Sequence, residues 1–155
     1  MRRKARWRVR RFLGFSIAND GSERRIAPKA LATFKARIRE MTRRTRGISL
    51  PQVIEELTPY LIGWRGYFGF CQTPSVLRSL EQWLRRRLRA VVWKQWKYGR
   101  VRFAELQKRG VSKNLAAQTA GSAHGPWRIS NSPALSMALP NTYFASLGLT
   151  PLVVN

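Results

Sequence analysis

Arginine dominates the chemistry that this chain can offer. Of its 155 residues, 30 are Lys or Arg and 7 are Asp or Glu, which gives a formal net charge of +23. Seven of the basic residues are lysines, so the other 23 are arginines. The planar arginine fork binds phosphate through two hydrogen bonds and stacks on bases, and 6 Trp, 7 Phe and 4 Tyr add further stacking surface. This composition favours binding to RNA or to unpaired strands.

Residues that could catalyse a reaction or bind a metal are scarce. Cys71 is the only cysteine and His124 the only histidine, so one chain cannot form a disulfide or a four-ligand zinc site. Two-metal phosphoryl transfer needs clustered carboxylates, and the only aspartate, Asp20, lies in an Asn-Asp-Gly sequence typical of a turn. We therefore expect a protein that is not an enzyme by itself and has no cofactor or metal. Cys71 is expected to be a small buried residue in a reducing, cytoplasmic compartment.

The segment from Thr73 to Tyr98 predicts the clearest helix, with a basic stripe on one side. Thr73 suits an N-cap and Pro74 suits the first turn. The apolar face is expected to contain Leu77, Leu80, Leu84, Leu88 and Val91. At about 100° per residue, the stripe away from that face contains Arg78, Arg85, Arg89 and Trp96, flanked by Arg86, Trp93 and Lys97. A charged stripe of this kind is either a solvated helix face or an RNA-contacting face.

Two more basic clusters are candidates for the same interface. Residues 43–46 end a predicted helix, where cations also suit the exposed carbonyls, so capping and recognition are equally supported. Residues 1–11 form a basic arm, either disordered or an edge strand, that could order on phosphate. The full set of candidate RNA-binding residues is Arg2, Arg3, Lys4, Arg6, Arg43, Arg44, Arg46, Arg78, Arg85, Arg86, Arg89, Trp93, Lys94, Trp96, Lys97 and Arg128.

A short hairpin and two helices are expected to precede the clear helix. Alternation, turn residues and apolar periodicity predict strands over 12–18 and 24–27 and helices over 28–46 and 50–68. Ser49 followed by Gln52 fits the capping-box pattern at the start of the second helix. Pro59 should kink or interrupt that helix.

The chain carries no charged residue after Arg128. The segment from Ile129 to Asn155 is interrupted too often by proline and polar residues to span a membrane, so we expect it to dock on the body of the protein and expect no membrane partner. The elements expected after the clear helix are helices over 101–109 and 112–120, a loop over 121–128, a one- or two-turn helix at Pro133 and a helix capped by Asn141.

Short motifs follow one another along most of the chain. They are RFLGF at 11–15, RIAPK at 25–29, LTPYLIGW at 57–64, TPSV at 73–76, WLRRRLR at 83–89, WKQWK at 93–97, WRISNSP at 127–133 and NTYF at 141–144. In this order they resemble the thumb of group II intron reverse transcriptases, also called domain X or the maturase-specific domain. The resemblance covers nearly all residues from 11 to 152, and the combined pattern is specific.

The resemblance implies a mainly α fold. It implies a helical thumb bundle with a short N-terminal β-strand or hairpin and a C-terminal extension of short helices. The expected segments are a basic arm and remnant of the last palm strand over 1–27, the three-helix thumb over 28–98, and the C-terminal part of the maturase-specific domain over 99–155.

The resemblance also implies a function. The thumb binds group II intron RNA and assists its splicing, and in a full reverse transcriptase it grips the template-primer duplex. The fingers and palm, with their metal-binding aspartates, are missing from the motifs, so we expect a non-catalytic maturase domain unless a separate palm-bearing chain joins it. Two alternatives stay open, a general structural RNA-binding protein and a non-functional truncated remnant.

Overall fold

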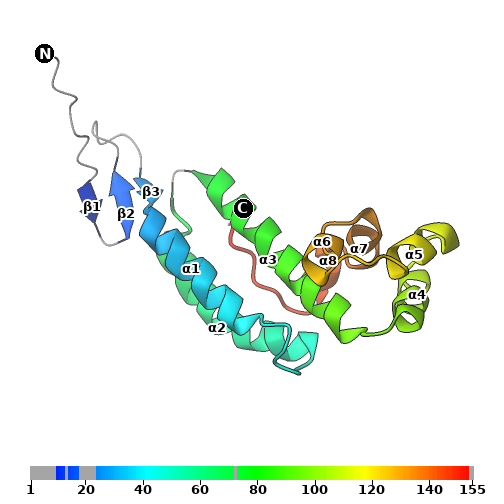
Figure 1. Ribbon diagram of the computed structural model, residues 1–155. Coiled ribbons are helices and arrows are strands. Elements are labelled where there is room, and N and C mark those ends of the chain that lie inside the picture. The colour runs from blue at the N-terminus through cyan, green and yellow to red at the C-terminus, as the bar shows by residue number, and fades with distance from the viewer. Residues whose placement is uncertain (1–9, 13, 18–23, 72, 154–155) are drawn as a thin grey trace, which may run out of the picture.

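The computed structural model describes residues 10–12, 14–17, 24–71 and 73–153 (Figure 1). At one end lies an antiparallel sheet in the order β1 (Arg10–Phe12), β2 (Phe15–Ile17) and β3 (Arg24–Ile26). The predicted return strand is confirmed, but the single strand predicted over 12–18 is wrong. Gly14, with a φ of +85° that favours glycine, lies where the chain reverses between β1 and β2.

Three long helices supply most of the protein core. They are α1 (Pro28–Met41), α2 (Leu50–Phe68) and α3 (Pro74–Gln95). Their inward faces follow the predicted apolar spacing, and one continuous cluster of buried side chains extends from Ile26 to Leu152. The described part of the chain is mainly helical, which confirms the expected fold class.

The helix ends follow local chemistry in part. Thr73 lies at the N-cap position of α3, as predicted, but its side chain accepts no capping hydrogen bond. The Ser49 side chain accepts a hydrogen bond from the Gln52 backbone N–H, which confirms the predicted cap of α2. Pro59 was predicted to kink or interrupt α2, and the interruption is wrong, because α2 continues through Pro59. Pro59 and Glu55 are both exposed, so the Glu55 carbonyl that Pro59 leaves without a donor lies on the solvent side of the helix.

Five short helices complete the part of the chain that the structure describes. They are α4 (Gly99–Lys108), α5 (Lys113–Ala120), α6 (Pro126–Ile129), α7 (Pro133–Ala138) and α8 (Asn141–Ser146). The loop predicted over 121–128 is partly wrong, because Pro126 opens α6. Asn141 is the first residue of α8 and not its cap, since its side-chain oxygen accepts a hydrogen bond from Arg89 instead.

The uncharged C-terminal segment docks on α3, as predicted from its composition. Leu135, Leu139, Phe144 and Leu152 are fully buried, and the chain after α8 runs back along α3 (Figure 1). The Glu81 carboxylate accepts hydrogen bonds from the backbone N–H groups of Leu152 and Val153. In the part of the chain that the structure describes, no helix has the length and apolar character needed to cross a membrane.

Replacing Glu81 by Ala should release the end of this segment. The change removes the acceptor for two backbone N–H groups, and one of them belongs to fully buried Leu152. We expect the free energy of unfolding to fall by about 1–3 kcal/mol and hydrogen exchange at Leu152 and Val153 to become faster. Glu55→Ala, at an exposed position on α2, is the matched control. Unchanged exchange at both amides in Glu81→Ala would contradict the assigned anchor.

Candidate nucleic-acid interface

A cationic patch surrounds Trp83 where α1 meets the middle of α3. Lys35 Nζ lies 5.7 Å from the centre of the Trp83 ring, Arg39 Cζ 5.5 Å and Arg87 Cζ 5.8 Å. These distances allow cation–π attraction. Arg44 is exposed just after α1, and its positive charge lowers the pKa of Arg87, so we include it in the group. We call Lys35, Arg39, Arg44, Trp83 and Arg87 the Trp83 patch.

Arg87 is the fixed member of the patch. Its Nε donates to the hydroxyl of buried Thr42 at 2.9 Å, and one of its terminal nitrogens donates to the Arg39 carbonyl at 3.4 Å. Partial burial lowers the pKa of Arg87, and the positive charges of Arg44 and Arg39 lower that pKa further. A guanidinium stays protonated at neutral pH, so the three positive charges repel one another. A bound anion would reduce this repulsion and would therefore be stabilised at the site.

No carboxylate neutralises the Trp83 patch in the described structure. The ion pairs among the described residues are Arg37–Glu40, Arg46–Glu56, Arg85–Glu81 and Arg109–Glu105. None of them includes a member of the patch. Three cations beside an aromatic ring and a fourth near Arg87, without acidic partners, suit a phosphate backbone with a base that can stack.

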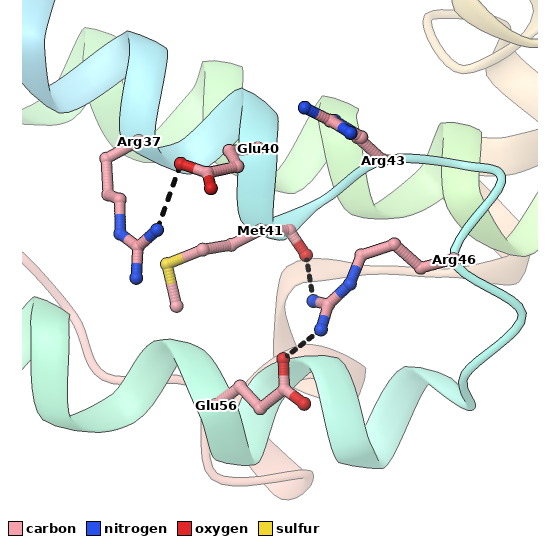
Figure 2. A pocket seen from close by; sticks show the side chains of 6 residues that line it. All are labelled: Arg37, Glu40, Met41, Arg43, Arg46 and Glu56. Carbon is pink, nitrogen blue, oxygen red and sulfur yellow. Dashed lines mark hydrogen bonds and ion pairs between the residues drawn. The ribbon is translucent and has the colours of Figure 1, made fainter.

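The basic cluster predicted at residues 43–46 divides into two roles. Arg46 donates to the Met41 carbonyl at 2.8 Å and pairs with Glu56 at 2.7 Å, so it caps the end of α1 (Figure 2). Arg37 pairs with Glu40 on the same side of α1, whereas Figure 2 draws no interaction from Arg43. Arg43 and Arg44 are exposed. The capping interpretation is confirmed for Arg46, and Arg43 and Arg44 stay candidates for RNA binding.

The basic stripe predicted on α3 is largely covered by the C-terminal segment. Arg86 donates to the Trp127 carbonyl at 2.8 Å and to the Ser130 hydroxyl at 3.2 Å, and its guanidinium lies 3.8 Å from the centre of the Trp127 ring. Arg89 donates to the Leu139 carbonyl at 2.9 Å and to Asn141 Oδ1 at 3.0 Å.

Arg86 and Arg89 are therefore partly covered, whereas Arg78 and Lys97 are exposed, and the choice between a solvated face and an RNA-contacting face stays a prediction. The uncharged segment brings carbonyl and side-chain oxygens to α3, and these oxygens need donors once they leave water. Burial, together with the charge of Arg85, lowers the pKa of Arg89. Arg85 pairs with Glu81, and Arg78 is exposed. RNA contacts by these arginines stay a prediction, limited to the N–H groups that the segment leaves free.

The two tryptophans predicted near the end of α3 face inward. Trp93 is 1% exposed and belongs to the core, so its ring has no free face for a base. Trp96 is half-buried against the same core. Both rings lie on the side of α3 that faces α4, where their apolar area is removed from water. The Arg102 guanidinium on α4 lies 4.5 Å from the centre of the Trp93 ring.

The remaining candidates are dispersed. Lys94 and Lys97 are exposed at the end of α3, and Arg128 is exposed on α6. Arg2, Arg3, Lys4 and Arg6 lie outside the described residues. The candidates missed by sequence reasoning are Lys35, Arg39, Trp83 and Arg87, although Lys35 and Arg39, and likewise Trp83 and Arg87, have the four-residue spacing of neighbours on one helix face.

The described residues contain no group of three His, Cys, Asp or Glu side chains that could bind a metal ion. Cys71 is a free, buried thiol, as predicted. His124 is exposed in the turn before α6.

A helical domain with a basic and aromatic surface of this kind is typical of nucleic-acid-binding proteins. The family model for the group II intron, maturase-specific domain, matches residues 31–110, just over half of the chain. The chain therefore belongs to this family. The matched residues contain all of α2, α3 and α4 and every member of the Trp83 patch. A search of curated proteins found no match.

Proposed function

We propose that this protein binds group II intron RNA through the Trp83 patch and assists splicing of the intron. The observation that carries the proposal is a set of three cations around one ring, with Arg44 near one of them, without ion-pair partners among the described residues and inside the part of the chain that matches the family. The transesterifications belong to the intron RNA in this proposal, so the protein is not itself an enzyme.

The protein's contribution is electrostatic and steric. Cations that neutralise phosphates release counterions and allow RNA segments to approach each other. Arg87 is already oriented by Thr42, so it loses less side-chain freedom when phosphate binds. Trp83 supplies a ring on which an unpaired base can stack. The exposed candidates that extend the interface beyond the patch are Arg43, Arg78, Lys94, Lys97 and Arg128.

Other partners from the family resemblance fit the same surface. A template-primer duplex also presents a phosphate backbone to the patch, and polymerase chemistry would need a separate chain that carries the palm and its metal-binding aspartates. We propose the intron RNA as the main partner because the matched family is defined by the group II intron.

Replacing Trp83 by Leu should weaken intron binding while the fold is retained. Leu keeps apolar packing at this half-buried position but removes the flat ring. Because stacking of one base contributes about 1–3 kcal/mol, we expect an affinity loss of about tenfold. The protein concentration needed for half-maximal stimulation of intron splicing at low Mg²⁺ should rise by the same factor.

Two variants control this experiment. Trp83→Phe keeps an aromatic ring and should retain most of the affinity. Phe70→Leu removes an aromatic ring that is 77% exposed after α2, outside the patch, and should change neither affinity nor splicing. Equal intron affinity and equal splicing for Trp83→Leu and the wild-type protein would reject the proposed role of the patch.

A further inference from the structure

Trp83 also lines a hollow of about 430 Å³ where α3 meets the segment that carries α7 and α8. The side chains that matter for its chemistry are Gln82, Trp83, Arg85, Arg89, Asn131 and Asn141. The volume lies in the range of small-ligand sites, about 300–1,000 Å³. The lining therefore combines cations, carboxamides and an indole in a space of nucleotide size.

The carboxamides of the hollow have free hydrogen-bonding groups. Gln82 and Asn131 are exposed, and within the described structure their side chains form no hydrogen bond. Asn141 Oδ1 accepts from Arg89, which leaves the Asn141 amide N–H groups free. A carboxamide presents a donor and an acceptor side by side, which is the pattern that pairs with the edge of a base.

The arginines of the hollow are fixed but not saturated. Arg89 uses Nε and one terminal nitrogen on Leu139 and Asn141, so its other terminal nitrogen keeps its donors. Arg85 pairs with Glu81 at 3.6 Å, a distance that leaves most of its donors available. These donors are held in place by the protein, so they suit the phosphate of a nucleotide whose base contacts the carboxamides.

We infer that this hollow binds one unpaired nucleotide of the RNA, with the base beside Trp83 and the carboxamides and the phosphate on Arg85 and Arg89. A base inside a duplex has its pairing edge occupied, whereas a bulged or looped base can leave the stack and present that edge. The inference rests on the proposed function, because the Trp83 patch would bind the backbone next to this nucleotide.

The test compares two RNA hairpins that differ by one bulged nucleotide. The wild-type protein should bind the bulged hairpin about tenfold more tightly than the fully paired hairpin, from one stacked base and its hydrogen bonds. The double variant Gln82→Ala, Asn131→Ala keeps the stacking on Trp83 but loses the hydrogen bonds to the base, so its preference for the bulged hairpin should be at least about threefold smaller than that of the wild-type protein. Gln107→Ala, Asn114→Ala removes two exposed carboxamides from α4 and α5 and should keep the wild-type preference.

The variants change no charge, so the salt dependence of binding should stay the same while the preference becomes smaller. A preference that is undiminished in the Gln82 and Asn131 variant, or that is absent from the wild-type protein, would overturn the inference and leave the proposed function standing. Failure of the wild-type protein to bind either hairpin would overturn both. Circular dichroism checks that the variants are folded. If the double variant unfolds, Gln82→Ala alone provides the same test, because Gln82 is at an exposed helix position.

Discussion

Trp93→Ala is expected to lower the free energy of unfolding by about 3–5 kcal/mol, the usual effect of removing a large aromatic side chain from a core. Trp93 is 1% exposed, its ring packs edge-on against Trp96 at 6.1 Å, and Arg102 covers it from α4. Because a whole domain of this size has a stability of about 5–15 kcal/mol, the variant should be partly or fully unfolded at moderate temperature.

Urea unfolding followed by circular dichroism measures this effect. Trp83→Leu is the matched control, because Trp83 is a tryptophan on the same helix that is only half-buried, and it should lose much less stability. The structural role of Trp93 is contradicted if Trp93→Ala unfolds at the wild-type urea concentration and loses only RNA binding.

Replacing Lys35, Arg39 and Arg44 by Gln should weaken RNA binding by roughly 100-fold at low salt, from three phosphate contacts of about 1 kcal/mol each. The slope of log affinity against log salt should become shallower by about 2–3, because each cation that binds a phosphate contributes 0.7 to 0.9 to the slope. Arg87 is left in place, since it donates to Thr42 and to the Arg39 backbone.

A variant with equal charge loss elsewhere controls this prediction. Arg100→Gln, Lys108→Gln and Lys113→Gln together remove three exposed cations from α4 and α5. If net charge alone decides binding, both triple variants should lose affinity equally. A loss confined to the variant of the Trp83 patch supports a localised interface, and equal losses would contradict it.

Local chemistry made much of the fold predictable. Apolar spacing located α1, α2 and α3, Ser49 and Ser112 cap the helices that follow them, and the uncharged composition after Arg128 predicted a docked segment. The errors in these local predictions are small: the predicted strand is divided at Gly14, and Asn141 begins α8 without capping it. A helix projection was enough for these elements because they depend on neighbours in the sequence.

The candidate site was harder to predict because it depends on contacts between distant segments. A projection of α3 places Arg89 on an outer face, and nothing in the local sequence shows that the Leu139 carbonyl will need its donors. The Trp83 patch forms only when α1 lies against α3 and brings Arg39 to Arg87. The four-residue spacing within each helix was visible in the sequence, but the contact between the two helices was not.

The arginine content also overstates the surface available to RNA. Arg46, Arg86, Arg87, Arg89 and Arg102 all donate to backbone carbonyls of other elements or of helix ends. The five donors of a guanidinium let one side chain satisfy several buried oxygens, which is useful where short helices leave carbonyls unpaired. Part of the net charge is therefore structural, and the interface is smaller than the composition suggests.

The most direct test of the central claim is equilibrium binding to a group II intron RNA and to a structured RNA of matched length, across a range of monovalent salt. Purely electrostatic binding weakens equally for both RNAs as salt rises. A maturase domain that recognises its intron should keep a preference of about tenfold or more near physiological salt. Parallel loss of affinity for both RNAs would contradict the account and leave a general RNA-binding protein or a remnant.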